Sequence, residues 1–241
     1  MANRFFLLIL TSTCIAFSSY GQIDTITRSK QSLSRYLKQS IVPAAFIGTG
    51  MFMKLHKTGF NDLTVRNNVV KNFPGFHTHA DDYLRFAAIP IIYGVDLLGV
   101  KAKTDIKNRT AILFKAEVIM FATVTLLKNE THVIRPDNSN DKSFPSGHTA
   151  QAFLGAVFIQ KEYGSKSILF PIAGYTIAAS VGVLRILNNR HYTSDVLVGA
   201  GIGMLSAHIA YWTHRYKWNK NVVVMPTYSN RSAGVYFALI F

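Results

Sequence analysis

Three short clusters in the second half of the chain bring cationic, histidine and carboxylate side chains together at close spacing. Such groups suit phosphoryl chemistry, because guanidinium and ammonium groups pair with phosphate oxygens while imidazole acts as a nucleophile or a base. The clusters are Lys128 with Arg135-Pro136, then Pro145-Ser146-Gly147-His148, then Arg185 with His191 and Asp195.

The second cluster stands directly before an apolar segment that begins near Thr149. Ser146 is a favourable N-cap residue, and Gly147 allows the backbone to approach a ligand closely. Because a helix N-terminus presents unpaired N–H groups and partial positive charge, it suits a phosphate group. We therefore expect a phosphate site here, with His148 placed to donate a proton to the leaving group.

In the third cluster, His191 and Asp195 are four residues apart. Residues at this spacing share one face of a helix, so the carboxylate can reach one ring nitrogen. That contact fixes the tautomer, stabilises positive charge on the ring and leaves the other nitrogen free to attack. The spacing indicates a nucleophile with an orienting carboxylate.

Three further cations, Lys128, Arg135 and Arg185, belong to the same clusters. A phosphoryl group in transfer spreads negative charge over its equatorial oxygens, and an arginine pairs with two such oxygens at once. Fixed cations can therefore replace a metal ion, so we expect neither metal nor cofactor. Each cluster alone is common as a cap or a surface network, whereas their combination in this order favours a site.

The segment His77-Thr78-His79-Ala80-Asp81-Asp82 also contains ligand types found in metal sites. The simpler interpretation is a polar loop that caps a helix starting near Tyr83, with Asp81 or Asp82 at its N-terminus. We favour the capping interpretation, which leaves the site without a metal.

The composition indicates membrane contact. Of the 241 residues, 49% are hydrophobic, and 26 basic against 12 acidic residues give a net charge of +14. Such an excess suits nucleic acid, an anionic membrane surface or a phosphorylated substrate. The basic residues stand mostly in short loops between apolar runs, which argues against nucleic acid as a partner. The single cysteine, Cys14, excludes an intrachain disulfide.

Five apolar segments predict helices. They define the expected fold as an all-α bundle of about five to six mostly apolar, membrane-embedded helices, with a bundle lying on the membrane as the alternative. The segments are Tyr83–Val100, Thr110–Leu127, Thr149–Ile159, Ile168–Leu184 and Val196–Trp212.

The region before these segments is expected to contain three parts. Gln22–Gln39 is polar and is predicted to begin with a helix along a surface. Ile41–Met53 is apolar but too short to be assigned as a membrane span. Lys54–Ala80 is a polar connection. The predicted division of the chain is a signal peptide or uncleaved anchor at 1–21, a polar N-terminal region at 22–80, a helical core at 81–214 and a tail at 215–241.

The signal peptide is predicted from Arg4, followed by the apolar run Phe5–Phe17 and small residues. At the other end, Val222–Met225 and Gly234–Phe241 alternate around a turn-rich stretch and predict a short β-hairpin.

Basic residues also predict an orientation. If all five segments span, the loops Lys101–Arg109 and Lys161–Lys166 lie on the same side, and their positive charge assigns that side to the cytoplasm. The three clusters then lie on the opposite side. The predicted location is the inner membrane of a bacterial envelope with the site facing the periplasm. An outer-membrane or a membrane-associated periplasmic location is the alternative.

Together the clusters resemble the signature of the type 2 phosphatidic acid phosphatase and vanadium haloperoxidase superfamily. That signature is Lys-x6-Arg-Pro, Pro-Ser-Gly-His and Ser-Arg-x5-His-x3-Asp, and the resemblance runs from about Asp82 to Trp212. One departure is Leu184, which stands where the family usually has serine before the arginine. That serine is not a catalytic group.

The resemblance implies an all-α core with the phosphate between helix ends. It implies that His191 is the nucleophile that forms a phosphohistidine, that Asp195 orients it and that His148 is the general acid. It also implies a metal-independent phosphatase whose phosphate-binding residues are Lys128, Arg135, Ser146, Gly147 and Arg185.

The function favoured by these observations is hydrolysis of a lipid-linked phosphate or diphosphate, such as undecaprenyl diphosphate, phosphatidylglycerol phosphate, phosphatidic acid or a lipid A phosphate. A lipid phosphotransferase shares the first half-reaction. A vanadate-dependent haloperoxidase would use His191 as the vanadate ligand, although the short chain and apolar segments argue against it. The non-enzymatic alternative is an anion-binding or assembly protein. The oligomeric state is not predicted.

Overall fold

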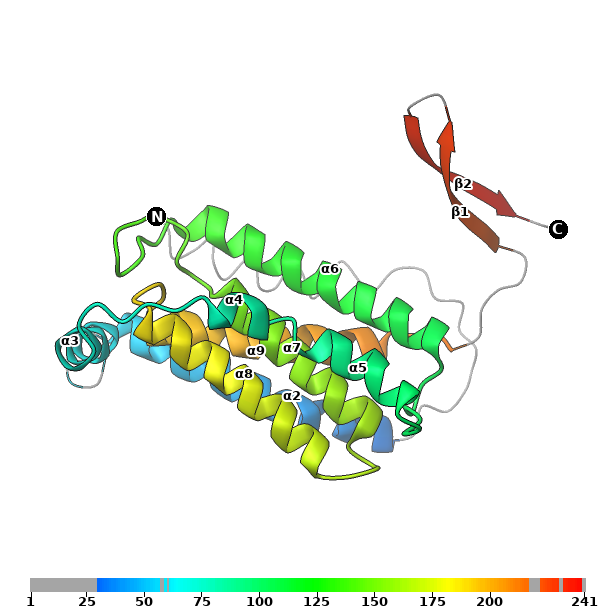
Figure 1. Cartoon of the computed structure of the whole chain (residues 1–241), viewed down its shortest axis with the longest axis horizontal. Helices are drawn as coiled ribbons and strands as arrows, with labels where there is room; N and C mark the ends of the chain where they lie inside the picture. The colour runs from blue at the N-terminus through cyan, green and yellow to red at the C-terminus, as the bar shows by residue number, and fades with distance from the viewer. Residues whose placement is uncertain (1–29, 57–58, 60, 217–221, 230–231, 240–241) are drawn as a thin grey trace. The chain divides into compact units, whose positions relative to one another are not determined.

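The computed structural model describes residues 30–56, 59, 61–216, 222–229 and 232–239 (Figure 1). The predicted signal peptide, with Cys14, lies outside these residues. The chain divides after Arg35 into two units, and the bundle and site belong to the second. The helices in the described part are α2 Lys30–Leu55, α3 Asp62–Asn72, α4 Ala80–Leu84, α5 Ala88–Leu97, α6 Ile106–Thr131, α7 Gly147–Tyr163, α8 Leu169–Leu187 and α9 Thr193–Trp212.

The all-α core is confirmed, and four of the five predicted apolar segments coincide with the single helices α6, α7, α8 and α9. The prediction of one helix over Tyr83–Val100 is wrong, because the chain turns at residues 85–87 and forms α4 and α5 instead. At this turn the backbone hydrogen bonds join residues three apart rather than four: Phe86 N donates to Tyr83 O, and Ala87 N donates to Leu84 O. Such tight bonds are typical of the end of a helix.

Helix α7 is the centre of the bundle and packs against both α8 and α9, while α9 also packs against α6. Figure 1 shows these helices running alongside one another. The core is built from aliphatic, aromatic and alanine side chains, whose burial supplies most of the driving force for this packing. Its most completely buried members include Ile92, Ile112, Leu154, Val157, Phe158 and Val181.

Glycines allow α9 to lie unusually close to its neighbours. A methyl group added at Gly203 would overlap the main-chain oxygen of Ala150 in α7, and one at Gly199 would overlap the main-chain oxygen of Ser146. A methyl group at Gly201 would lie 2.7 Å from the main-chain oxygen of Pro43 in α2. The backbones of α2, α7 and α9 are therefore in direct contact.

Three helices, α6, α8 and α9, are long and apolar enough to cross a membrane. In α6 and α8 only 22% and 28% of the apolar window is buried in the protein, against 78% in α9. The hydrophobic side chains of α6 and α8 thus face outward, where lipid can cover them. They include Phe114, Val118, Phe121, Leu126, Leu169, Ile172 and Val183.

The N-terminal region differs from its prediction in two respects. The separation of Gln22–Gln39 from Ile41–Met53 is wrong, because α2 continues through Pro43 to Leu55. Tertiary packing against α9 compensates for the hydrogen bond that proline removes. The polar connection Lys54–Ala80 contains the helix α3, which begins at an N-cap, Asn61, whose side chain accepts from Leu63 N and Thr64 N.

At the end of the bundle where α6 begins, a buried polar network joins three elements. Arg109 of α6 pairs with Asp96 of α5 and donates to the hydroxyl of Tyr163 at 3.2 Å. The Tyr163 hydroxyl donates in turn to the main-chain oxygen of Ile92 at 2.7 Å. Arg109 and Tyr163 are fully buried, so water cannot replace these hydrogen bonds if they break. The network therefore stabilises the packing of α5, α6 and α7 at this end.

The predicted C-terminal hairpin is confirmed. Strand β1, Val222–Ser229, pairs in antiparallel register with β2, Ser232–Leu239. The register runs from the pair Val222 and Leu239 to the pair Ser229 and Ser232.

Candidate active site

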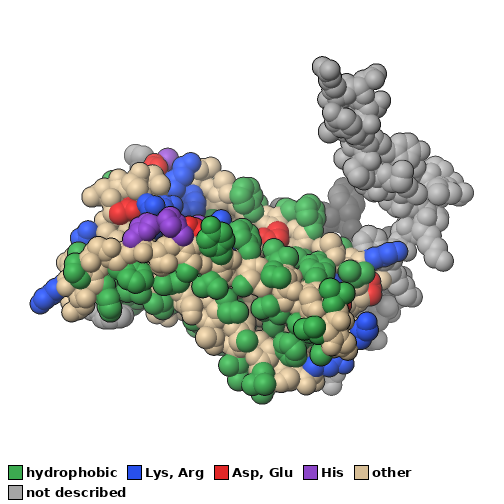
Figure 2. Space-filling model, viewed as in Figure 1, with side chains coloured by type: hydrophobic (Ala, Val, Ile, Leu, Met, Phe, Trp, Pro, Cys, Tyr) green, Lys and Arg blue, Asp and Glu red, His purple; other side chains and the backbone are tan. Residues whose placement is uncertain are grey.

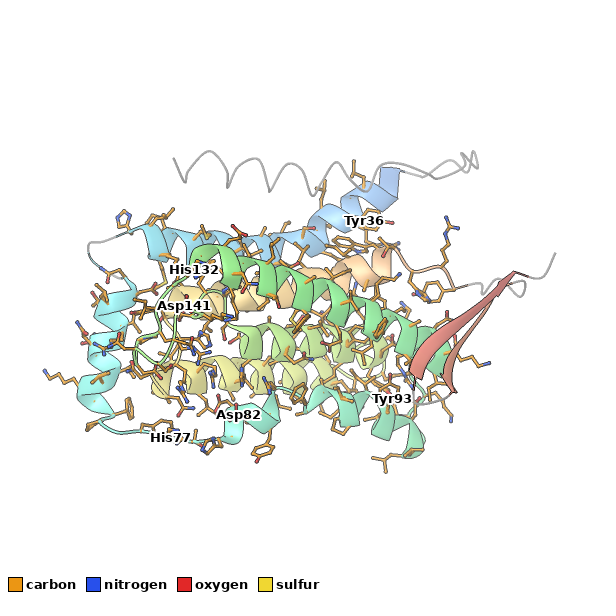
Figure 3. The ribbon with its side chains drawn as sticks, turned by 90° about the horizontal axis from the view of Figure 1, so that it is seen from above. Tyr36, His77, Asp82, Tyr93, His132 and Asp141 are labelled. Carbon is orange, nitrogen blue, oxygen red and sulfur yellow. The ribbon has the colours of Figure 1, made fainter. Side chains whose placement is uncertain are left out.

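Four helix termini meet at one end of the bundle. Helices α6 and α8 end there and α7 and α9 begin there, because short connections make successive helices antiparallel. In Figure 3, His77, Asp82, His132 and Asp141 lie toward this end and Tyr93 toward the other. Figure 2 shows cationic, acidic and histidine side chains gathered at this end, while hydrophobic side chains cover much of the remaining face.

His191 and Asp195 lie together as predicted, but His191 stands in the loop before α9 and not on a helix face shared with Asp195. The distance from His191 Nδ1 to Asp195 Oδ2 is 3.5 Å, and both side chains are buried. The same carboxylate oxygen accepts hydrogen bonds from the Ser143 hydroxyl and from Tyr192 N. The other oxygen lies 3.7 Å from Lys54 Nζ. Asp195 is thereby fixed on the Nδ1 side of the ring, which leaves Nε2 available for chemistry.

Burial lowers the pKa of His191 to about 4, because the charged ring would lose its hydration, and the nearby Asp195 only partly offsets this effect. The cations Arg185 and Lys128 lower the pKa further. His191 is therefore neutral at physiological pH. A neutral imidazole has the lone pair that a nucleophile requires.

The start of α7 is built as the second cluster predicted. Ser146 is the N-cap residue, and its hydroxyl bonds to Thr149. Ser146 N donates to the main-chain oxygen of Asp195 at 3.0 Å, and the absent side chain of Gly199 makes room for this approach. The segment that carries Gly147 and the helix that carries Asp195 are thus fixed against each other through the backbone.

The cations of the first and third clusters surround this helix start. Lys128 lies in the last turn of α6 and donates to the main-chain oxygen of Lys142. Arg135 follows in the loop, and Arg185 lies in the last turn of α8. Arg135 Nε and Arg185 Nε are buried and have no hydrogen-bond partner among the described residues. Buried donors are rarely left unpaired, so they indicate a place for an anion.

Arg185 is held by Asp81 of α4. The distance from Arg185 Nη1 to Asp81 Oδ2 is 2.6 Å, and Asp81 Oδ1 accepts from Asn188 Nδ2 at 3.0 Å. Asn188 also bonds to both the main-chain N–H and the main-chain oxygen of Thr78. The loop before α4 is therefore attached to the end of α8, and Asp81 fixes the orientation of the Arg185 guanidinium.

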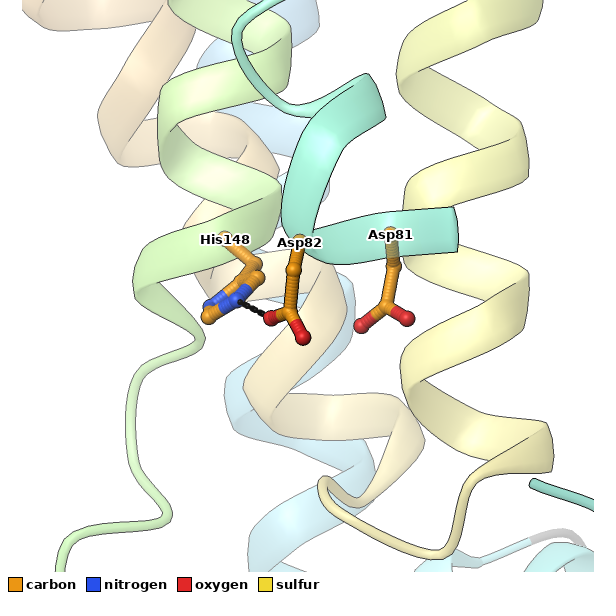
Figure 4. A group of neighbouring side chains, drawn as sticks. All are labelled: Asp81, Asp82 and His148. Atoms are coloured by element: carbon orange, nitrogen blue, oxygen red, sulfur yellow. Dashed lines mark hydrogen bonds and ion pairs between the residues drawn. The ribbon is translucent and has the colours of Figure 1, made fainter. Parts of the chain in front are cut away.

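His148 contacts Asp82, the next residue of α4. The distance from His148 Nε2 to Asp82 Oδ1 is 2.7 Å (Figure 4). On its other side, His148 Nδ1 lies 3.4 Å from Arg85 Nη1. Asp81 and Asp82 lie in the first turn of a helix, as predicted, but this helix begins at Ala80 and its N-cap side chain makes no capping hydrogen bond. Both carboxylates bind side chains of the site instead.

Asp81, Asp82 and His148 offer ligand atoms that all lie within 4.8 Å of one another, an arrangement that could hold a metal ion. Arg185 Nη1, however, lies 2.6 Å from Asp81 and 4.0 Å from Asp82. A fixed guanidinium repels a second cation at the same carboxylates. The donor set therefore fits a metal poorly.

Two cavities adjoin the helix termini. The larger, of about 460 Å³, is lined by both charged and apolar side chains. It lies against α6, whose outward face is hydrophobic, so an apolar chain can extend from the cavity along this helix. Its wall consists of Arg85, Phe86, Met120, Phe121, Val124, Thr125, Lys128, Arg135, Gly147, His148, Gln151 and His191.

The smaller cavity, of about 230 Å³, is polar throughout. It shares only Arg135 and His148 with the larger cavity, so these two side chains separate the two spaces. Its wall consists of His77, Thr78, His79, Asp82, Arg135, His148, Arg185, Asn188 and Arg190.

The structure brings all eight predicted site residues to one region. Five of them line the larger cavity: Lys128, Arg135, Gly147, His148 and His191. Arg185 lines the smaller cavity. Asp195 and Ser146 line neither cavity and lie behind them, buried against the backbone. His132 is the C-cap of α6, and its ring pairs with Asp141 outside both cavities.

Sequence reasoning missed the residues of α3 that connect the site loops. Asp62 accepts hydrogen bonds from Ser194 N and Oγ at the start of α9. Arg66 donates to the main-chain oxygen of Pro136 at 3.2 Å and to Asn189 Oδ1 at 3.4 Å. Such contacts span 70 to 132 residues along the chain, so no local pattern signals them.

Residues 110–219 match the model of the PAP2 superfamily. This match includes the eight predicted site residues and the four helix termini that carry them. The resemblance predicted from the three clusters is confirmed by this match. With three helices able to span a bilayer, the chain is a membrane protein.

Among curated proteins, "Lipid A 1-phosphatase" of Porphyromonas gingivalis is 37% identical over 140 residues, which is 57% of this chain and 31% of the relative. "Probable diacylglycerol pyrophosphate phosphatase 1" of Schizosaccharomyces pombe is 32% identical over 81 residues, or 29% of each chain. The chain thus spans 31% and 29% of the length of these relatives. The crystal structure of Aquifex aeolicus LpxE shares 21% identity and a TM-score of 0.47, covering 60% of this chain and 93% of that one.

Proposed function

We propose that this protein hydrolyses a phosphate or diphosphate ester of a lipid through a phosphohistidine on His191. The observation that carries the proposal is the convergence of Lys128, Arg135 and His148 with His191 on one cavity whose wall also contains apolar side chains of α6. Unpaired buried donors on the arginines suit phosphate oxygens, and the apolar wall suits a lipid chain.

In the first half-reaction, His191 Nε2 attacks phosphorus and the bond from phosphorus to the lipid oxygen breaks. His148 donates a proton to that oxygen, so the lipid leaves as a neutral alcohol. Asp195 lies 3.5 Å from Nδ1 and stabilises the positive charge that forms on the ring. The cations neutralise the three equatorial oxygens of the phosphoryl group, as a metal ion would.

In the second half-reaction, water attacks the phosphohistidine and gives a proton to His148, which is now neutral. The bond between phosphorus and His191 Nε2 breaks, and inorganic phosphate leaves. The enzyme returns to its first state, with His148 protonated and His191 neutral. A lipid or sugar alcohol in the place of water would make the protein a phosphotransferase, so the acceptor is part of the test.

The lipid class is supported by the relatives, two of which are named as phosphatases of lipid A and of diacylglycerol pyrophosphate. Both substrates join a phosphate group to an apolar body. The substrates to test first are therefore a lipid A phosphate and a lipid diphosphate, followed by phosphatidic acid and phosphatidylglycerol phosphate.

For the location, we infer the inner membrane of a bacterial envelope, with the site facing the periplasm. Support comes from the loops at the end of the bundle away from the site. The segment before α6 carries Lys101 and Lys103, while Lys161 lies in the last turn of α7 and Lys166 follows that helix. Short loops rich in lysine favour the cytoplasmic side. Cysteines introduced into these loops should not react with a membrane-impermeant reagent added outside intact cells. Their labelling would contradict this orientation.

The function is tested by phosphate release from these lipids in detergent with EDTA, for the wild type, His191→Ala and His132→Ala. His132 is a matched control, since it also pairs with an aspartate but lines neither cavity. EDTA-resistant release that only His191→Ala abolishes is expected, together with a phosphorylated His191 in rapidly quenched wild type. Absence of release from every lipid would contradict the proposal, and release that needs a metal would return attention to Asp81 and Asp82.

A further inference from the structure

Asp82 contacts a proposed catalytic histidine from outside the region that defines the family. It lies on α4, before residues 110–219, and belongs to none of the three clusters. Its Oδ1 lies 2.7 Å from His148 Nε2, and its Oδ2 lies 3.3 Å from His79 Nδ1. Figure 4 shows the side chain of Asp82 directed at His148, with Asp81 beside it on the same short helix.

The neighbours of His148 assign its two nitrogens. Arg85 Nη1 lies 3.4 Å from Nδ1, and a guanidinium only donates, so Nδ1 of the neutral ring is the acceptor. The ring proton of the neutral form is then on Nε2, where the carboxylate of Asp82 accepts it. Asp82 therefore selects the tautomer of His148.

The same contacts assign the two nitrogens to the two cavities. Asp82 lines the smaller cavity and Arg85 lines the larger one, and His148 lies between them. Nδ1 is thus directed toward the cavity that also contains His191. The arrangement resembles the His191–Asp195 pair in that a carboxylate holds one nitrogen, while the other faces the larger cavity, where a substrate oxygen would take the place that Arg85 Nη1 occupies at 3.4 Å.

The surroundings of His148 otherwise oppose a positive ring. Burial, Arg185 and Arg85 together lower its pKa to about 4, although Asp82 acts to raise it. Asp81, the neighbouring carboxylate, is already paired with Arg185. The charged and titratable groups that line a cavity with His148 are Asp82 and Arg85 from the α4 segment, Lys128 from α6, Arg185 from α8, Arg135, Arg190 and His191 from the loops, and His77 and His79 before α4.

We infer that Asp82 is a positioning residue that supplies the countercharge of protonated His148 and directs its Nδ1–H at the leaving oxygen. The inference rests on the proposed function, since it requires His148 to be the general acid. Protonated His148 carries a proton on each nitrogen. The Nδ1 proton passes to the lipid oxygen as the bond to phosphorus breaks, and Asp82 keeps the Nε2 proton. Water returns a proton to Nδ1 in the second half-reaction.

The test compares leaving groups. A lipid alcohol needs a proton to leave, whereas 4-nitrophenolate is a stable anion, so only the lipid reaction depends strongly on a general acid. Because general acid catalysis contributes about 10² to 10⁴-fold, Asp82→Asn should lower kcat/KM for a short-chain lipid phosphate by about 100-fold and for 4-nitrophenyl phosphate by only about threefold. The basic limb of the lipid pH profile should move to lower pH.

Two further variants make the test specific. Asp82→Glu keeps the carboxylate and should restore most of the lipid activity. Asp141 pairs with His132 at 2.8 Å outside both cavities, so it is a matched histidine–aspartate pair. Asp141→Asn should leave kcat/KM unchanged for both substrates. If Asp82→Asn does not fold, the lipid-to-nitrophenyl ratio and the pH profile of Asp82→Glu decide the question.

Equal losses for both substrates, with an unchanged pH profile, would show that Asp82 only supports the fold and would overturn the inference. Unchanged lipid activity in Asp82→Asn would overturn it as well. A wild-type protein that releases phosphate from neither substrate would instead contradict the proposed function, so the two failures are distinguishable.

Discussion

The main-chain oxygen of Ser146 lies against the α-carbon of Gly199, so closely that no side chain fits between α7 and α9 at this point. The contact joins the helix start that presents Gly147 to the helix that carries Asp195. The geometry of the site therefore depends on a glycine that has no chemistry of its own.

We predict that Gly199→Ala destabilises the protein by about 1–3 kcal/mol, the usual cost of overpacking, and also lowers activity because the two helices separate. Thermal unfolding in detergent and phosphate release measure the two effects. Gly48→Ala is the control, since a methyl group at Gly48 meets nothing within 4 Å and alanine favours a helix. A Gly199→Ala variant as stable and active as the control would contradict this account.

The pH dependence follows from the two histidines. His191 must be neutral to attack, and burial holds its pKa near 4, so kcat/KM should fall as pH decreases through about 4. His148 must be protonated, and burial with Arg185 lowers its pKa to about 4 in the empty site, so kcat/KM should also fall as pH rises above this value. We expect an acidic optimum for kcat/KM.

For kcat the basic limb should lie at higher pH than for kcat/KM. A bound phosphate dianion favours the protonated form of His148, and kcat reports the ionisation of the bound state. Rate profiles over a range of buffers at constant ionic strength check both expectations. An alkaline optimum for kcat/KM would contradict the assigned protonation states.

Arg66 of α3 joins the loop of Pro136 to that of Asn189. Arg66→Met removes both hydrogen bonds but keeps most of the aliphatic length. We expect kcat/KM to fall about tenfold, because hydrogen bonds from a charged group contribute roughly 1.5–3 kcal/mol and position Arg135 and His191 through their loops. Lys71→Ala, an exposed change on the same helix, should have no effect. Equal activity in the two variants would show that α3 does not influence the site.

The network at the opposite end should affect stability without affecting the chemistry. Tyr163→Phe leaves Ile92 O without its donor and removes one acceptor from Arg109, which should cost about 1–3 kcal/mol. Activity per folded molecule should remain unchanged. Tyr175→Phe is the control, since that hydroxyl bonds to Gln160 at an exposed position. A loss of turnover in folded Tyr163→Phe would reveal coupling between the two ends.

Much of this site is predictable because its chemistry is local in sequence. The spacing of His191 and Asp195 places them in contact, and Ser146 before an apolar run predicts a helix N-terminus. Four helices were likewise recognisable from apolar segments of sufficient length. Residues that act with their near neighbours are the ones that a sequence reveals.

The missed features depend on contacts between distant residues. Asp81 and Asp82 follow a pattern that is typical of helix caps, and only the packing of α4 against α7 and α8 brings them to His148 and Arg185. The change from a polar to an apolar segment suggested two separate elements, yet α2 continues through Pro43, whose main-chain oxygen packs closely against Gly201. In both cases tertiary packing overrides a local preference.

The wall that His148 and Arg135 form between the two cavities has a consequence for the order of events in the proposed reaction. The smaller cavity has exposed histidines, His77 and His79, along its wall and is open to water. Water attacks phosphorus in line with His191, from the position that the lipid oxygen has left, so the alcohol must withdraw from that position first. The smaller cavity gives this water a route to the phosphoryl group that does not pass through the bilayer, so the chain of the departing lipid need not clear the larger cavity before the water arrives.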